Sequence, residues 1–199
     1  MSVLDVSRET IHRLERYQAL LLKWNPRINL VAPDTLKDAW DRHLMDSAQV
    51  FDIADPGPHW VDLGSGGGFP GMVCAVLAME RSPGTSFTLI ESDGRKCAFL
   101  RTVARDLELH VEVLTERVEA ATAQKASNLS ARALAPLPQL LSYAERHLAE
   151  NGVALFQKGR NYQSEVQIAR QTWHFECEAV NSKTEEGAAI LKISDIAHV

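Results

Sequence analysis

The sequence is poor in cysteine. Its 199 residues include three, Cys74, Cys97 and Cys177, which lie far apart and form no C-x-x-C motif. This spacing indicates neither a disulfide framework nor a zinc site. Isolated cysteines are typical of small buried side chains in a reducing compartment, so we expect a cytoplasmic protein with no bound metal.

Long apolar runs are also missing. No segment approaches the roughly 20 apolar residues that a membrane-spanning helix needs, and Asp5 and Glu9 interrupt any signal-peptide core. We therefore expect no membrane partner. The net charge of −5 argues against a protein that coats nucleic acid generally, but it is compatible with a local basic patch. With 45% hydrophobic and 24% charged residues, the rest is ordinary globular protein.

Glycine is concentrated at one place. Five of the 11 glycines stand within D-L-G-S-G-G-G-F-P-G, residues 62–71. The apolar run before it, residues 60–63, predicts a buried parallel strand, and residues 71–79 predict a helix that begins after Pro70. A strand, a glycine turn and a helix present free backbone N–H groups and a positive dipole end to a ligand. The stretch therefore predicts a nucleotide-type pocket.

The glycine turn has two interpretations. Gly66, Gly68 and Gly71 match the G-x-G-x-x-G fingerprint of dinucleotide sites. Gly64, Gly66 and Gly68, with Asp62 two residues ahead, are more typical of a site for S-adenosylmethionine (SAM), which has no pyrophosphate to hold. In a SAM site, Asp62 either orients the turn or reaches the ammonium group of the cofactor. A purely structural cap is the alternative.

Strand and helix patterns alternate through the rest of the chain. Strands are expected at 86–91, 111–114, 126–134 and 153–157, and helices at 94–107, 137–148 and 162–171. This alternation predicts an α/β, Rossmann-like fold with a mainly parallel sheet and helices on both faces. The last two strands, 173–181 and 188–193, predict an antiparallel hairpin at one sheet edge.

A helical extension precedes this core. Ser7 predicts the start of a first helix and Asn25-Pro26 its end, and a second helix is expected from Pro33 onward. Residues 55–58, D-P-G-P, are a linker. We expect one domain, in which residues 1–57 form the helical extension and residues 58–199 the Rossmann-like core.

Ligands of such sheets bind at the carboxyl ends of the strands. Glu91 ends the second strand, and its carboxylate is either an acceptor for ribose hydroxyls or a solvated loop acid. Val118 and Glu119 follow the third strand and either frame an adenine or begin a solvated helix. Arg132 and Lys158 follow the fourth and fifth strands, near the reacting end of a cofactor, although a surface ion pair is the alternative.

Six segments together resemble the ribosomal RNA small-subunit methyltransferase G family, also called glucose-inhibited division protein B. They are W-N-P-R-I-N-L (24–30), R-H-L-M-D-S (42–47), the glycine stretch (62–71), R-V-E (117–119), A-R-A-L-A-P-L (131–137) and K-G (158–159). The first three in combination are specific, and the resemblance covers nearly the whole chain. It implies a class I SAM-dependent methyltransferase that methylates N7 of one guanine in 16S rRNA.

The resemblance also implies roles for residues and partners. Cofactor contacts are implied at Gly64, Phe69, Val118, Glu119 and Arg132. The substrate is 16S rRNA, either free or in an assembling small subunit, and we expect a monomer. The chain departs from the family pattern at Ala126-Ser127, where Phe-Asp is common, and at Ala131, where Ser is common.

The chemistry requires little from side chains. Guanine N7 carries a lone pair and no proton, so Arg132 and Lys158 are expected to position the reactants and not to carry protons. Two alternatives come from other classes of protein. One is an RNA-associated regulatory module that binds SAM, and the other is a nicotinamide-dinucleotide oxidoreductase, for which the sequence has no second nucleotide-binding half.

Overall fold

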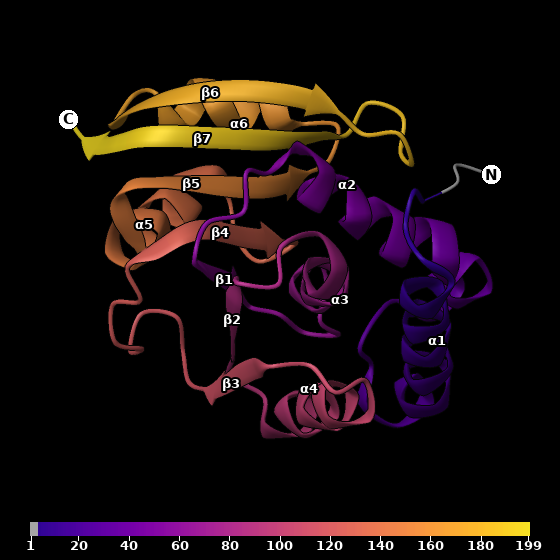
Figure 1. The fold of residues 1–199 in the computed structure, drawn as a ribbon. Coiled ribbons are helices and arrows are strands. Elements are labelled where there is room, and N and C mark those ends of the chain that lie inside the picture. The colour runs from indigo at the N-terminus through magenta and orange to yellow at the C-terminus, as the bar shows by residue number, and fades with distance from the viewer. Residues whose placement is uncertain (1–3) are drawn as a thin grey trace.

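The computed structural model describes residues 4–199, which form a seven-stranded sheet in the order β3-β2-β1-β4-β5-β7-β6 (Figure 1). The strands are β1 (His59–Leu63), β2 (Ser86–Glu91), β3 (Val111–Thr115), β4 (Ala126–Arg132), β5 (Leu148–Lys158), β6 (Trp173–Asn181) and β7 (Ala189–His198). The first five are parallel, and β7 runs antiparallel to both of its neighbours. The predicted fold class, including the antiparallel edge hairpin, is confirmed.

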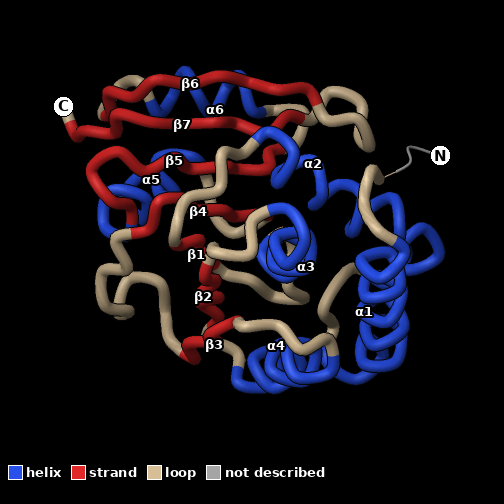
Figure 2. The backbone as a smooth tube through the Cα atoms, in the orientation of Figure 1, coloured by secondary structure: helices blue, strands red, loops and turns tan. Residues whose placement is uncertain are grey.

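Helices cover both faces of the sheet (Figure 2). They are α1 (Arg8–Ile28), the 3₁₀-helix η1 (Pro33–Asp38), the π-helix η2 (Trp40–Met45), α2 (Asp46–Ile53), α3 (Gly71–Arg81), α4 (Gly94–Asp106), α5 (Leu137–His147) and α6 (Tyr162–Ala169). α2, α3 and α4 pack on one face, with α1 outside α3 and α4, and α5 and α6 lie on the other. Within residues 4–199, no helix is long and apolar enough to cross a membrane.

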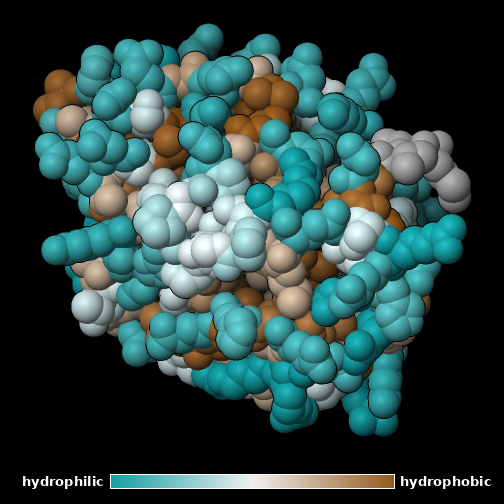
Figure 3. Space-filling view, viewed as in Figure 1, coloured by the Kyte–Doolittle hydropathy of each residue, from teal (hydrophilic) through white to brown (hydrophobic). Residues whose placement is uncertain are grey.

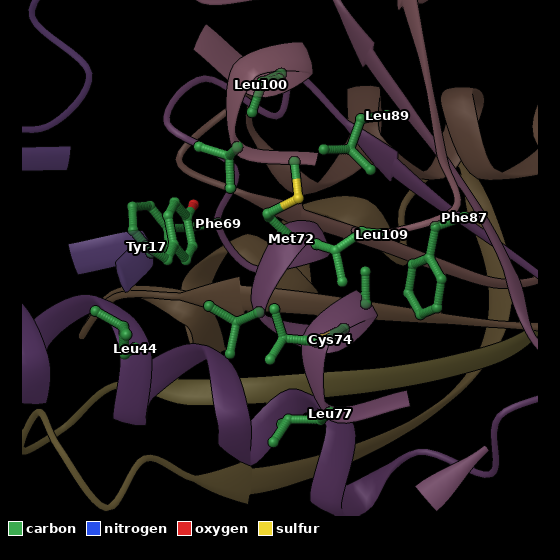
Figure 4. Packing of buried hydrophobic residues seen from close by; sticks show 14 of the residues in the cluster. Tyr17, Leu44, Phe69, Met72, Cys74, Leu77, Phe87, Leu89, Leu100 and Leu109 are labelled. Carbon is green, nitrogen blue, oxygen red and sulfur yellow. The ribbon is translucent and has the colours of Figure 1, made fainter. Parts of the chain in front are cut away.

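Each face has its own hydrophobic cluster, because successive residues of a strand point to opposite faces. Trp60 of β1 packs with α3 and α4, whereas Val61 and Leu63 pack with α5. Figure 4 shows the first cluster, in which Tyr17 of α1 lies beside Phe69 and Met72. On the face seen in Figure 3, hydrophilic residues predominate and hydrophobic ones form small separate groups.

The helical extension begins as predicted and ends differently. Ser7 caps the start of α1, because its hydroxyl accepts a hydrogen bond from the backbone N–H of Thr10 at 3.2 Å. The predicted end at Asn25-Pro26 is wrong, since α1 continues to Ile28. Pro26 lies in the last turn, where a missing N–H removes a single bond. The side-chain oxygen of Asn25 then accepts the N–H groups of the next two loop residues, 30 and 31, at 2.8 Å each.

The expected second helix is three short helices of different kinds. η1, η2 and α2 follow one another with almost no break. The π-helix contains three consecutive buried residues, His43, Leu44 and Met45. A π-helix has a wider turn than an α-helix, so it keeps more consecutive residues on one side. Hydrophobic periodicity alone cannot distinguish these helix types. The prediction of one regular helix from Pro33 onward is therefore wrong.

The boundary of β5 is also wrong in the prediction. The strand begins at Leu148, five residues before the predicted start at residue 153, and includes Asn151-Gly152. Leu148 pairs with Ala126, and Val153 pairs with Asn128, so the residues between them bulge out of the ladder. A Cβ on Gly152 would lie 2.7 Å from the carbonyl oxygen of Ala126, which explains glycine at this position.

The departure from the family pattern at Ser127 is accommodated by hydrogen bonds. Its hydroxyl donates to the carbonyl oxygen of His59 at 2.7 Å and accepts the N–H of the same residue at 3.1 Å. Ser127 thus joins the start of β4 to the start of β1. The Trp60 side chain makes a second connection, because its ring N–H donates to the hydroxyl of Ser130 at 2.9 Å.

Candidate functional site

A cavity of about 510 Å³ lies at the carboxyl ends of β1, β4 and β5. This is the edge at which parallel α/β sheets bind their ligands. Three parts of the chain line it: the glycine turn with Phe69, the helical extension with Arg42, His43 and Asp46, and the β4, β5 and hairpin ends with Arg132, Gln157, Lys158 and Glu185. Figure 1 shows α2 close to the arrowhead of β5 at this edge.

The glycines of the turn are required for different structural reasons. Gly64, Gly66 and Gly68 have φ angles of 60°, 54° and 91°, a left-handed conformation that glycine adopts without penalty. A Cβ on Gly66 would have no protein atom nearer than 3.8 Å, so the position opens into the cavity. A Cβ on Gly68 would instead lie 2.5 Å from the hydroxyl oxygen of Tyr17. Gly66 therefore leaves space for a ligand, and Gly68 leaves space for α1.

Glu91 holds the turn from below. Its carboxylate oxygens accept the N–H of Gly66 at 2.9 Å and the N–H of Asp93 at 2.8 Å. The side chain is 8% exposed and does not line the cavity. Each oxygen keeps a second lone pair, so the ribose contact of Glu91 stays a prediction, and the structure adds a bracing role that the sequence reasoning missed.

Asp62 is completely buried under the turn. One carboxylate oxygen accepts the hydroxyl of Ser130 at 2.6 Å, and the other has no hydrogen-bond partner among the described residues. Burial raises the pKa of Asp62 to about 6, against the lowering effect of the Ser130 bond. A cationic group at the turn would offset the cost of burying this carboxylate. Asp62 does not line the cavity, so its contact with an ammonium group stays a prediction.

An aromatic group surrounds Phe69. The ring centroid of Phe69 lies 5.3 Å from that of Tyr17 and 5.2 Å from that of His43, and both pairs are stacked. The guanidinium carbon of Arg132 lies 4.8 Å from the same centroid, in cation–π contact. Phe69 is 4% exposed. It joins α1, the π-helix and the end of β4 at the wall of the cavity.

His43 is a packed histidine and not a general base. Its Nε2 atom lies 2.7 Å from the hydroxyl of Thr35. Burial, together with the positive charge of Arg132, lowers the pKa of His43 to about 4. The imidazole is therefore neutral at ordinary pH and adds no positive charge to the cavity.

Arg132 and Lys158 both line the cavity, but their heads are held differently. The Nη1 atom of Arg132 lies 3.4 Å from a carboxylate oxygen of Asp46. Burial lowers the pKa of Arg132, and Asp46 opposes that change. Lys158 forms a 2.6 Å ion pair with Glu165 and donates to the carbonyl oxygen of Ala135 at 3.1 Å. Lys158 thus stabilises the loop after β4. The guanidinium of Arg132 instead lies between Asp46 and the aromatic ring of Phe69.

Val118 and Glu119 lie apart from this cavity. Val118 is buried, and its carbonyl oxygen accepts a ring N–H of His147 at 2.9 Å. Glu119 is exposed and accepts the hydroxyl of Tyr143 at 2.6 Å, a bond that lowers the pKa of Glu119. Neither residue lines the cavity. They follow β3, next to β2 and its Glu91, so their contact with an adenine stays a prediction.

The sequence reasoning missed the residues that hold Arg132. Asp46 begins α2, Gln157 is in β5, and Thr184 is in the turn between β6 and β7. The side chains of Gln157 and Thr184 each donate a hydrogen bond to the carboxylate of Asp46. Asp46 does stand in the segment R-H-L-M-D-S, so its place in a specific motif was the available signal. Gln157 and Thr184 had no such signal.

A parallel sheet with a glycine turn after β1, a buried acid at the end of β2 and an arginine after β4 defines a class I SAM-dependent methyltransferase. Solved structures support the fold. The crystal structure of M. jannaschii TYW2 in complex with AdoMet aligns with a TM-score of 0.59 at 12% identity, over 79% of this chain and 76% of that one. A methyltransferase from Geobacter sulfurreducens aligns with a TM-score of 0.59 at 14% identity, over 96% and 90%.

The chain belongs to the rRNA small subunit methyltransferase G (GidB) family, whose model matches residues 10–191. The ribosomal RNA small subunit methyltransferase G of Ruegeria sp. (strain TM1040) is 55% identical over 98% of this chain and 96% of its own length. The protein is thus a methyltransferase by family and SAM-dependent by fold class. Of the alternatives from sequence, the nicotinamide-dinucleotide oxidoreductase is excluded.

Proposed function

We propose that the protein transfers the methyl group of SAM to N7 of one guanine in 16S rRNA. The observation that carries this proposal is a cavity with a cofactor-type glycine turn, an arginine paired with Asp46 and a packed, neutral histidine at its wall. N7 of guanine has a lone pair and no proton. The nucleophile therefore needs alignment and exclusion of water, and no proton has to be removed.

Residues of the turn would hold the cofactor. The open position at Gly66 lets backbone approach the ligand, with Gly64 beside it. The unpartnered carboxylate oxygen of Asp62 suits the ammonium end, and Glu91 suits the ribose. Phe69 would cover the methionine part. When bound, SAM supplies a methyl group activated by the neighbouring cationic sulfur.

Other residues would receive the base. The neutral His43 ring adds no charge that would repel a cationic cofactor, and its stack on Phe69 keeps that wall apolar. The guanidinium of Arg132 can donate to the O6 edge of a guanine. A donor placed on N7 itself would block the reaction, so the direction of Arg132 matters. Lys158 keeps the loop after β4 in place.

We also propose that residues 1–57 and 58–199 form one domain that acts as a monomer on 16S rRNA, free or in an assembling subunit. Tyr17 and Leu21 of α1 are fully buried and belong to the same hydrophobic cluster as Trp60 of β1. A cluster shared in this way favours cooperative unfolding of both parts. One transition in urea, followed by separate probes of helix and tryptophan, is the expected result.

The activity is tested with SAM that carries a labelled methyl group. We expect label in one guanine of 16S rRNA, located by nuclease digestion and mass spectrometry, with the methyl group at N7. Free rRNA and small subunits isolated from cells that lack the protein are compared as substrates. SAM binding without methyl transfer to either would favour the regulatory module, and label on an exocyclic amine would contradict the choice of N7.

A further inference from the structure

The carboxylate of Asp46 lies at a junction of four parts of the chain. One oxygen accepts the side-chain N–H of Gln157 at 2.6 Å and faces the guanidinium of Arg132 at 3.4 Å. The other accepts the hydroxyl of Thr184 at 2.7 Å. α2, β4, β5 and the β6–β7 turn therefore meet at a single side chain.

Asp46 is also the counter-charge of Arg132. It forms the only ion pair of Arg132 within residues 4–199, and both side chains are 18% exposed. The guanidinium has two further contacts, with the carbonyl oxygen of Arg42 at 3.4 Å and with the ring of Phe69. Because a partly buried cation without a counter-charge is costly, Asp46 determines where the guanidinium rests.

We propose that Asp46 is a positioning residue for methyl transfer, which directs the guanidinium of Arg132 and compensates its charge beside the cofactor. This inference rests on the proposed function. A sulfonium and a guanidinium in one cavity repel each other, and a carboxylate bound to the guanidinium removes that repulsion. During transfer the sulfur–methyl bond breaks, the N7–methyl bond forms, and positive charge passes from the sulfur to the base. Asp46 lies on the side of the cavity that holds Arg132, where a negative charge favours this shift.

Asp46→Asn separates charge from packing. The amide oxygen can accept from Gln157 as before, and the amide nitrogen can donate to Thr184, whose hydroxyl both donates and accepts. The variant therefore keeps its hydrogen bonds and loses the negative charge. We expect kcat to fall about 10- to 100-fold, as for a misplaced catalytic group. KM for the rRNA and the Kd for SAM should change by less than about threefold.

A matched control exists in the same helix. Asp52 of α2 pairs with Arg81 at 2.6 Å, at a surface away from the cavity at the glycine turn. Asp52→Asn makes the same chemical change to a partner of the same type. Its kcat should stay within about twofold of the parent value, since exposed ion pairs contribute little.

A double-mutant cycle shows whether Asp46 acts through Arg132. If it does, Asp46→Asn lowers kcat in the parent protein and has little further effect in Arg132→Ala, as coupled residues are non-additive. An equal loss in both backgrounds would overturn the proposal. Single-turnover measurements are used, because they can measure the slow methyl transfer expected of Arg132→Ala.

A second readout uses the protein without SAM. The side-chain Nε–H signal of Arg132, assigned by its absence in Arg132→Ala, should shift in the NMR spectrum of Asp46→Asn and stay in place in Asp52→Asn. Thr184→Val, which removes one bond to Asp46 at the exposed turn, should shift the same signal and serves if Asp46→Asn does not fold. An unmoved Arg132 signal with unchanged kcat refutes the positioning role. A shifted signal in a protein that methylates no guanine refutes the proposed function and leaves the pairing intact.

Discussion

The hydroxyl of Tyr17 donates a hydrogen bond to the carbonyl oxygen of Gly67, 50 residues further along the chain. Tyr17 belongs to the first helix and Gly67 to the glycine turn, and both are buried. The turn is thus fixed from two sides, by Tyr17 above and by Glu91 through the N–H of Gly66. The helical extension therefore helps to fix the conformation of the glycine turn.

Tyr17→Phe should weaken both the fold and cofactor binding. The ring still fills its place, but the carbonyl group of Gly67 loses its donor, which costs about 1–3 kcal/mol for a buried group. Urea unfolding measures the first effect, and calorimetric titration with SAM the second. Tyr162→Phe is the control, because within residues 4–199 the Tyr162 hydroxyl has a single contact, a long one of 3.5 Å from the side chain of Gln163. Unchanged SAM affinity in Tyr17→Phe would show that the bond from α1 to the glycine turn does not affect cofactor binding.

Gly66→Ala and Gly68→Ala should fail in different ways. At Gly66 the methyl group enters the cavity, so we expect a folded protein, destabilised by roughly 1–2 kcal/mol for the left-handed residue, that has lost SAM binding. At Gly68 the methyl group meets Tyr17 and Met72, so the fold itself should be destabilised. Gly84→Ala, where no atom lies within 4 Å, is the control. Normal SAM affinity in Gly66→Ala would remove the turn from the cofactor site.

The free energy of unfolding of Asp62→Asn should increase relative to that of the parent protein as pH rises. The pKa of Asp62 is about 6 in the folded protein against 3.8 as the ordinary value, so the folded state binds more protons between these pH values. Stability of the parent protein therefore declines over this window through Asp62, by up to roughly 3 kcal/mol. The variant lacks this loss.

The difference between Asp62→Asn and the parent isolates this effect. His43 titrates in the opposite sense, because its folded pKa, about 4, lies below the ordinary 6.5, but it does so equally in both proteins. Free energies of unfolding in urea at about pH 5 and about pH 7.5 provide the comparison. A difference that does not grow with pH would show that Asp62 is ionised throughout.

Reversing Lys23 and Arg27 to glutamate should weaken RNA binding. Both residues are exposed near the end of α1, and the loop that follows lines the cavity. Each lost phosphate contact lowers the slope of log affinity against log salt by roughly 0.7 to 0.9. SAM affinity should not change. Reversal of Lys125 and Arg105, which are exposed at the opposite edge of the sheet, should have little effect on either. An unaltered salt slope for Lys23 and Arg27 would assign α1 to cofactor binding alone.

The parts of the fold that sequence predicts best are those fixed by local chemistry. β2 and β6 have the predicted bounds because each is an unbroken run between clear turn residues. The glycine turn, with Gly64 and Gly66 in left-handed conformations, follows from glycine itself. In the same way, the strand ends placed Arg132 and Lys158 at the cavity, since parallel strands share one carboxyl edge.

What sequence did not predict depends on distant contacts. The end of α1 passes Pro26 because the Asn25 side chain is bonded to the loop beyond it. The π-helix depends on which residues the sheet buries. Asp46 has an ordinary position at the start of a helix, and only the fold brings Gln157 and Thr184 to it. Lys158 was expected beside the reactants, and its bond to Glu165 required the position of α6.

The bond between Asp46 and Thr184 spans 138 residues. During synthesis the chain emerges from its N-terminus, and β7, the last strand, inserts between β5 and β6. A nascent chain that stops short of this hairpin has the glycine turn but lacks the residues that complete the cavity and hold Asp46. The cavity is therefore completed only after β7 has joined the sheet, late in the synthesis of the described residues.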